Sequence, residues 1–212
     1  MALVDSFASV IFDYGGVLAR HQSEADQAKM AEFLGISTER FSDLYWAKRI
    51  EYDKGLLTAT EYWQDVAREG GTRITPQIVD ELSALDTESW MQFDNVMWEW
   101  VRQLREAGKR LAILSNMPHE LGETLKKERK RLALFDQVTL SYEIHAVKPD
   151  PAIYEHCLQG LGSSPRDSLF FDDRIQNVEG AEALGIRAIQ FLDRDQILRD
   201  VSDWTSVSHP AR

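Results

Sequence analysis

The sequence predicts an α/β protein in which a parallel sheet carries helices on both faces and an all-helical segment follows the first strand. Two observations support this prediction. Short apolar runs alternate with amphipathic helical stretches through most of the C-terminal half, and this alternation is typical of a doubly wound parallel sheet. Residues 19–93 break the alternation, because they contain helix signals but no convincing strand. We therefore expect a core of residues 1–18 and 94–212 and an all-helical insert of residues 19–93.

Short buried strands are expected at five apolar runs: residues 9–12, 110–115, 137–141, 168–171 and 187–191. Helical patterns separate these runs, as in residues 94–108, where apolar side chains share one face and Gly108 ends the helix. In parallel sheets of this kind, ligands bind beyond the carboxyl ends of the strands. Polar residues that follow these runs are therefore the candidates for function.

Capping residues define the helices of the insert. Gly35 stops one helix, Thr58 and Glu61 form a capping box, and Thr75 before Pro76 opens another helix. Some aromatic residues there could stack on a sugar or base, but their helical spacing favours the core of a small bundle: Tyr45, Trp46, Tyr52, Tyr62 and Trp63. Three basic residues could attract an acidic substrate, and nothing in the sequence selects one of them: Arg20, Arg49 and Lys54.

Composition argues against several classes of function. The 212 residues carry 24 basic and 35 acidic side chains, a formal net charge of −11, so we expect no nucleic-acid partner. The dense basic run at residues 126–131 is interrupted by Glu128 and favours a solvated helix face. Cys157 is the single cysteine and is expected to be a packed thiol. No leader and no bilayer-spanning run is evident, so we expect a cytoplasmic protein without a membrane partner, ending in a loosely held tail at 203–212.

Polar residues follow the first two expected strands. Asp13 precedes Gly15 and Gly16, and glycines let the backbone approach an anion closely. Asp13 can therefore act as a metal ligand and nucleophile. The alternative is an aspartate that caps a strand-end turn. Ser115 and Asn116 follow the second strand, where a hydroxyl and the amides of a helix start make a natural oxyanion site. The same pair is also a common helix N-cap, and both interpretations stay open.

Two later segments add a lysine and an acidic pair. Pro149 and Pro151 restrict the backbone around Lys148, and a rigidly held lysine suits neutralisation of phosphate charge. The alternative is a surface lysine beside a helix start. Asp172 and Asp173 follow the fourth expected strand, and adjacent carboxylates repel each other unless a cation lies between them. Hard oxygen ligands suit magnesium, whereas the alternative is a solvated loop.

Taken in order, these segments resemble the four motifs of the haloacid dehalogenase-like hydrolase superfamily: VIFDYGGVL, LAILSN, KPDPAIY and FFDDRIQN. The resemblance covers essentially the whole chain. It implies a Rossmann-like core, and the insert is similar to the small helical cap of the family's first cap class. The third and fourth segments further resemble the branch that holds sugar-phosphate phosphatases and the N-terminal phosphatase domain of soluble epoxide hydrolase.

The resemblance implies a role for each residue. Asp13 would attack phosphorus and form an aspartyl-phosphate, with Ser115 and Lys148 as its catalytic partners. The phosphoryl group would be held by Gly15, Gly16, Ser115, Asn116 and Lys148. Magnesium would bind Asp13, the backbone carbonyl of Gly15 and Asp173, with Asp172 beside it or acting through water. Asn177 lies one helical turn after Asp173 and could orient that carboxylate or a bound water.

Position 15 departs from the family's pattern. Phosphatases of the family usually carry there a second aspartate that protonates the leaving group, and Gly15 has no side chain. Such a group contributes roughly 10²–10⁴-fold to the rate. His21 could replace it, although an exposed histidine without a role is the simpler interpretation.

We expect a magnesium-dependent phosphatase that hydrolyses a small phosphorylated metabolite, such as a sugar phosphate, and that is a monomer or a homodimer. One alternative is a weakly active or inactive binding or scaffold protein with this fold. The other is a 2-haloacid dehalogenase, whose relatives also lack the second aspartate. Dehalogenases need no magnesium, and the retained Asp172 and Asp173 argue against that activity.

Overall fold

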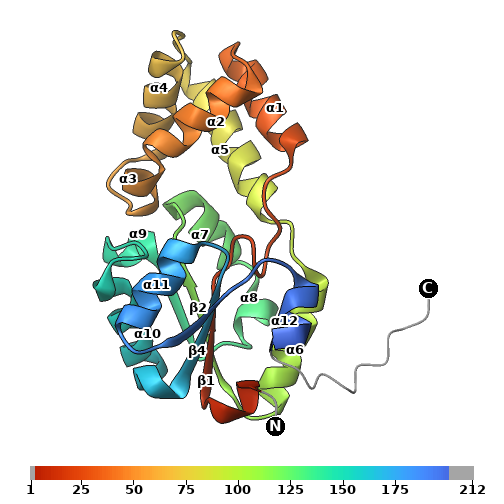
Figure 1. The fold of residues 1–212 in the computed structure, drawn as a ribbon. Coiled ribbons are helices and arrows are strands. Elements are labelled where there is room, and N and C mark those ends of the chain that lie inside the picture. The colour runs from red at the N-terminus through yellow and green to blue at the C-terminus, as the bar shows by residue number, and fades with distance from the viewer. Residues whose placement is uncertain (1–2, 201–212) are drawn as a thin grey trace, which may run out of the picture.

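The structure is a computed structural model that describes residues 3–200, and it consists of a sheet-based core below a helical unit (Figure 1). Five strands form the sheet: β1 (Ser9–Phe12), β2 (Arg110–Ser115), β3 (Gln137–Leu140), β4 (Ser168–Asp172) and β5 (Arg187–Gln190). Their order is β3-β2-β1-β4-β5, and the paired strands run parallel. The α/β class and the five expected strands are thus confirmed.

The central strand β1 is the point at which the strand order reverses. Phe12 pairs with Ile113 of β2 on one side and with Phe171 of β4 on the other. All four residues of β1 are buried. The chain passes from β1 to β2 on one side and returns from β3 to β4 on the other side, so a crevice opens beyond the carboxyl end of β1, which is where such folds bind ligands.

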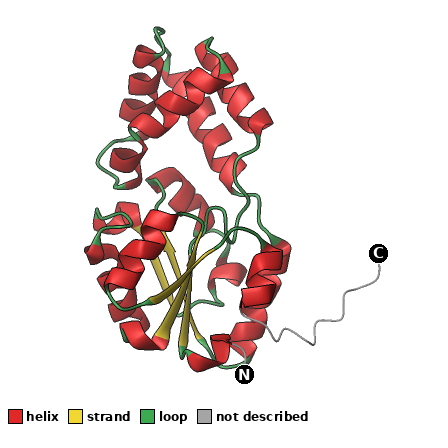
Figure 2. Cartoon of the chain, in the orientation of Figure 1, coloured by secondary structure: helices red, strands yellow, loops and turns green. Residues whose placement is uncertain are grey.

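Helices cover both faces of the sheet (Figure 2). Alternate side chains of β1 point to opposite faces, so Val10 and Phe12 join one apolar cluster and Ile11 joins another. The first cluster is completed by α6 (Asn95–Glu106) and α12 (Arg194–Asp200), and the second by α10 (Pro151–Leu161) and α11 (Ile175–Ala183). As expected, Cys157 of α10 is a buried free thiol.

Shorter elements complete the core: η1 (Leu3–Ser6), α7 (His119–Leu125), α8 (Arg129–Leu132), α9 (Ser141–Ile144) and η2 (Pro165–Asp167). The basic run at 126–131 does not form one solvated helix face, because α7 ends before it and α8 begins within it. Lys126 pairs with Glu123 and Glu143, at 2.8 and 2.7 Å. The Arg131 guanidinium lies 4.2 Å from the centre of the Phe93 ring. Lys126 and Arg131 therefore have intramolecular partners. The other three basic residues of the run are exposed to solvent: Lys127, Arg129 and Lys130.

The helical unit consists of α1 (Glu24–Leu34), α2 (Thr38–Ala47), α3 (Arg49–Asp53), α4 (Ala59–Glu69) and α5 (Pro76–Trp90). Three of its helix ends lie where the sequence predicts them. Gly35 closes α1 in the left-handed conformation, and Thr58 and Glu61 form the capping box of α4. The oxygen of Thr75 accepts a hydrogen bond at the start of α5. The unit has its own apolar cluster, which includes four of the five expected aromatics: Tyr45, Tyr52, Tyr62 and Trp63.

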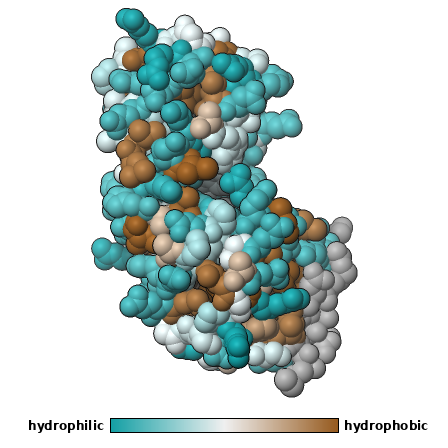
Figure 3. All heavy atoms as spheres, turned by 60° about the vertical axis from the view of Figure 1, so that its left-hand side comes forward, coloured by the Kyte–Doolittle hydropathy of each residue, from teal (hydrophilic) through white to brown (hydrophobic). Residues whose placement is uncertain are grey.

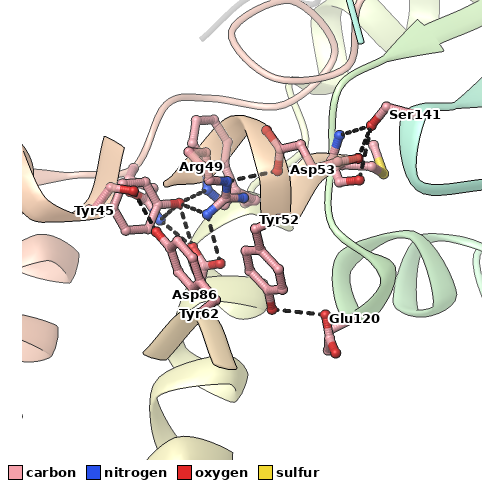
Figure 4. A network of polar contacts seen from close by, with 11 residues as sticks. Tyr45, Arg49, Tyr52, Asp53, Tyr62, Asp86, Glu120 and Ser141 are labelled. Atoms are coloured by element: carbon pink, nitrogen blue, oxygen red, sulfur yellow. Dashed lines mark hydrogen bonds and ion pairs between the residues drawn. The ribbon is translucent and has the colours of Figure 1, made fainter. Parts of the chain in front are cut away.

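The helical unit also contacts the core through α3 and the residues after it. Tyr52 donates a hydrogen bond to Glu120 of α7 at 2.8 Å, and Ser141 of α9 donates one to the carbonyl of Asp53 (Figure 4). Figure 3 shows an indentation between the two parts, with apolar side chains gathered beside it. Within residues 3–200, no helix is both long and apolar enough to cross a bilayer. The expected tail at 203–212 lies outside the described residues.

Candidate active site

The carboxylate of Asp13 lies at the carboxyl end of β1, in the crevice between β2 and β4. The backbone amide of Asp13 donates to the carbonyl of Phe171, which continues the sheet pairing for one residue. Its Oδ1 accepts hydrogen bonds from the amide of Tyr14 at 2.6 Å and from Nζ of Lys148 at 2.9 Å. These donors set the rotation of the side chain, which is 10% exposed. The sheet therefore presents one oriented carboxylate to the crevice.

Lys148 is fully buried beneath this carboxylate. Its Nζ contacts Oδ1 of Asp13 at 2.9 Å, Oδ2 of Asp172 at 2.6 Å and the carbonyl of Leu114 at 2.9 Å. Burial alone would lower the pKa of Lys148, but the two carboxylates outweigh that effect and raise the pKa above its ordinary value. Lys148 is therefore a permanent cation at the centre of the site, and not the surface lysine of the alternative interpretation.

Three carboxylates share this single ammonium group. Oxygen atoms of Asp13, Asp172 and Asp173 lie within 4.8 Å of one another. Burial raises the pKa of Asp13 to about 8, because the charges of Asp172 and Asp173 add to burial and outweigh the attraction of Lys148. Burial and Asp172 likewise raise the pKa of Asp173. This excess of hard, negative oxygens fits a divalent cation such as magnesium.

The adjacent aspartates have different surroundings. Both oxygens of Asp172 accept hydrogen bonds. Oδ2 accepts from Lys148 at 2.6 Å. Oδ1 accepts from the amide of Arg174 and from the side chain of Asn177, both at 2.9 Å. Asp173 keeps a 20% exposed carboxylate beside the crevice. Asn177 therefore orients Asp172, and not Asp173 as expected. Asp13 and Asp173 are the carboxylates best placed to hold a metal directly.

Ser115 and Asn116 lie at the end of β2 and line the crevice. The side chain of Asn116 brackets the backbone of Lys148: its Oδ1 accepts from the amide at 2.8 Å, and its Nδ2 donates to the carbonyl at 3.0 Å. These bonds commit the side chain of Asn116 to positioning Lys148, so only its backbone remains for phosphate. The sequence analysis missed this role, because the two residues lie 32 positions apart.

The two glycines after Asp13 lie close to neighbouring side chains. Gly16 has a φ of 76°, and an added Cβ would lie 2.7 Å from the His21 ring and 3.0 Å from the Asp173 carboxyl carbon. Nε2 of His21 lies 3.4 Å from Oδ2 of Asp173, and the His21 side chain is 62% exposed. His21 is therefore at the mouth of the site. A Cβ on Gly15 would lie 3.1 Å from the ring of Trp90.

One cavity of about 350 Å³ joins these residues to the helical unit. Eight predicted site residues line this cavity: Asp13, Gly15, His21, Ser115, Asn116, Lys148, Asp173 and Asn177. Its remaining walls come largely from residues to which the sequence analysis gave no role in the site: Tyr14, Asp53, Trp90, Leu121 and Arg174. Trp46 and Arg49 complete it, so one of the five expected core aromatics, Trp46, is 41% exposed beside the cavity. Spacing alone cannot show which helix residues face a distant strand end.

Fold and site together define an α/β enzyme core whose central strand ends at a carboxylate held by a buried lysine. The sequence profile of the haloacid dehalogenase-like hydrolases matches residues 7–185, and the chain belongs to this family.

Two curated proteins that are similar in sequence to this chain carry names of different activities. Phosphatase MT3486 of Mycobacterium tuberculosis is 28% identical over 95% of this chain and 97% of its own. The (S)-2-haloacid dehalogenase 4A of Burkholderia cepacia is 25% identical over 89% of this chain and 84% of its own.

Among solved structures, a HAD-family enzyme of Bacteroides thetaiotaomicron superimposes with a TM-score of 0.71 over 94% of this chain and 98% of its own. It was solved in complex with magnesium and inorganic phosphate, and it is 20% identical in sequence. This likeness supports the fold.

Proposed function

We propose that the protein is a magnesium-dependent phosphatase that hydrolyses small phosphomonoesters through an aspartyl-phosphate on Asp13. The observation that carries the proposal is the buried cluster in which Lys148 holds Asp13 and Asp172, with Asp173 and Ser115 on the same cavity. A protein that only scaffolds a partner has no need of such a cluster, because burying charges costs folding free energy. A relative named as a phosphatase agrees with this activity.

The residues of the chain divide the work of the first step. Asp13 attacks phosphorus with a carboxylate oxygen as the ester P–O bond breaks, and the leaving group departs with its electron pair and takes a proton from solvent. Lys148 stabilises the charge on the carboxylate and on the phosphoryl oxygens. The Ser115 hydroxyl and neighbouring backbone amides bind the phosphoryl oxygens. Asp172 acts indirectly, because it holds Lys148 in place. Water then attacks the aspartyl-phosphate, which releases inorganic phosphate and regenerates the Asp13 carboxylate.

Asp13, Asp173 and the backbone carbonyl of Gly15 would hold the magnesium ion, and Asp172 would act beside it. When bound, the ion supplies positive charge that offsets the carboxylates and the phosphoryl oxygens. The absence of a side chain at Gly15 leaves that carbonyl ligand in place. The cavity volume of about 350 Å³ lies near the lower end of ligand pockets, roughly 300–1,000 Å³. A small phosphorylated metabolite therefore fits better than a polymer.

The test is phosphate release from a panel of sugar phosphates, acyl phosphates, nucleotides and aryl phosphates, with magnesium and with a chelator. We expect release that requires magnesium and that Asp13→Asn abolishes. Asp80→Asn is the matched control, because Asp80 is an exposed aspartate of α5 remote from the cavity residues, and it should retain full activity.

Two outcomes would replace this function with another. Chloride release from 2-chloropropionate without added metal would identify a dehalogenase, an activity that one relative carries. No turnover on any substrate, together with tight binding of a protein partner, would identify a scaffold. Phosphate release unaffected by Asp13→Asn would contradict the mechanism.

A further inference from the structure

The ring of Trp90 occupies the space into which a side chain at position 15 would extend. An added Cβ on Gly15 would lie 3.1 Å from Cζ3 of Trp90, 3.5 Å from Cε3 and 3.9 Å from Cη2. Gly15 is not among the positive-φ glycines of the described chain, so its backbone does not require glycine. The constraint on position 15 therefore comes from Trp90, which lies 75 residues later at the end of α5.

Hydrogen bonds hold Trp90 in this position from both sides. Its Nε1 donates to Oη of Tyr45 at 3.1 Å, and its carbonyl accepts from Oη of Tyr14 at 2.9 Å. Tyr45 in turn donates to Asp86 at 2.7 Å and contacts Arg49 in the buried network of Figure 4. Trp90 is only 9% exposed. Moving the indole aside would break its bond to Tyr45, while the bond from Tyr14 fixes the backbone that carries it, so the ring is a fixed wall of the cavity.

The edge of the indole that faces Gly15 consists of carbon atoms and has no proton to donate. The only N–H of the ring is already bonded to Tyr45. We propose that Trp90 is a specificity-determining residue, which takes the place of an acid at position 15 and selects planar leaving groups that depart without protonation. This inference rests on the proposed phosphatase function and narrows its substrates to aryl and enol phosphates.

The chemical step balances without a protein acid. A carboxylate oxygen of Asp13 forms a bond to phosphorus as the ester P–O bond breaks, and the electron pair stays on the departing oxygen. The leaving group departs as a phenolate or enolate and takes a proton from solvent. Water then attacks the aspartyl-phosphate, loses a proton to solvent and releases inorganic phosphate. An alkoxide is too basic to leave readily in this way, whereas a flat, acidic leaving group can pack against Trp90.

A stability measurement tests the contact without any substrate. Gly15→Ala should lower the melting temperature of the wild-type chain but have little effect in a Trp90→Leu background, where the space is open. Trp98→Leu is the matched control, because Trp98 is a buried tryptophan that donates to the carbonyl of Leu18 and does not line the cavity. Gly15→Ala should lower the melting temperature as much in the Trp98→Leu background as in the wild type. An equal fall in melting temperature in all three backgrounds would show that Trp90 does not restrict position 15.

Activity measurements test the selectivity. Across a series of aryl phosphates, kcat/KM of the wild type should fall steeply as the pKa of the leaving phenol rises. Gly15→Asp alone should leave the slope steep, because Trp90 excludes a productive carboxyl group. The Gly15→Asp, Trp90→Leu double variant should flatten the slope and raise the rate on alkyl phosphates at least about 10-fold, since general acids contribute ~10²–10⁴-fold.

A single variant keeps the proposal testable if the double variant does not fold. Fluorinated alkyl phosphates can be matched to aryl phosphates in leaving-group pKa, and Trp90→Leu should lose the wild-type preference for the aryl member of each pair. A flat wild-type slope, or full activity of Gly15→Asp alone on alkyl phosphates, would overturn this inference and leave the phosphatase intact. No phosphate release from any ester by any variant would overturn both.

Discussion

The carboxyl group of Asp13 is in an environment that disfavours its charge before any ligand binds. The sheet places it beside Lys148, but burial and two further carboxylates still raise its pKa to about 8. A carboxyl group whose pKa is higher in the folded than in the unfolded chain binds its proton more tightly when folded. Its ionisation therefore opposes folding. The same property makes the site receptive to a cation.

The pKa of Asp13 predicts how stability depends on pH in chelator-treated protein. Because the pKa rises from its ordinary 3.8 to about 8, its contribution to the free energy of unfolding is largest at low pH. That contribution should diminish as pH rises through the interval between these values. Asp13→Asn should flatten this part of the profile and raise the melting temperature at pH 8. Thermal unfolding from pH 4 to 8 provides the measurement, and an unchanged profile would contradict the assignment.

The contact between α3 and the core depends on one glycine. Gly55 has a φ of 67°, and an added Cβ would lie 3.0 Å from the carbonyl oxygen of Tyr142 in α9. The same segment carries Tyr52, which bonds Glu120, and Asp53, whose carbonyl accepts from Ser141. A close backbone approach at Gly55 thus seats the helical unit over the cavity.

Substitution of Gly55 should weaken the contact between α3 and α9 in addition to the loss of stability that its left-handed backbone conformation causes. Gly71 is the matched control, because its φ is 85° and an added Cβ would meet nothing within 4 Å. Left-handed backbone costs a non-glycine residue about 1–2 kcal/mol, so Gly55→Ala and Gly71→Ala share that loss of stability. Only Gly55→Ala should also raise KM and speed amide hydrogen exchange in α3. Equal behaviour of the two variants would show that the contact with α9 is dispensable.

The whole molecule has a formal net charge of −11, and its candidate metal site adds local negative charge to that excess. A protein with this charge gains folding stability when it binds a cation in the folded state alone. We therefore expect the proposed magnesium ion to stabilise the folded protein.

Magnesium should raise the melting temperature of the wild type in a saturable way. At a concentration about 100 times its Kd, a ligand specific for the folded state adds about 2.7 kcal/mol. Asp173→Asn should weaken the effect, and sodium at equal ionic strength should not reproduce it. Differential scanning calorimetry with a magnesium titration would measure this. An equal rise in Asp173→Asn would place the ion elsewhere.

Local patterns account for what the sequence analysis predicted correctly. The five strands, the helix caps at Thr58 and Thr75 and the burial of Cys157 follow from residues close together in the chain. The structure also brings Asp13, Ser115, Lys148 and Asp173 to one cavity, as parallel strands require, although their roles stay predictions. The boundaries of the inserted helical unit likewise stay predictions. The basic run at 126–131 is largely exposed to solvent as predicted, but it is not one helix face, because charge pattern alone does not show where α7 ends.

The order of residues was enough to establish an α/β fold of the haloacid dehalogenase-like family with a carboxylate at the end of the first strand. Strand propensity, capping and the chemistry of strand ends are properties of short segments. Three contacts are visible only in the tertiary structure. Trp90 lies against Gly15, and the side chain of Asn116 bonds the backbone of Lys148. Arg49 contacts Tyr45 and Asp86. Each of these contacts depends on packing between separate elements. Packing has no signature in a single segment, and here it decides which leaving groups the site can accept.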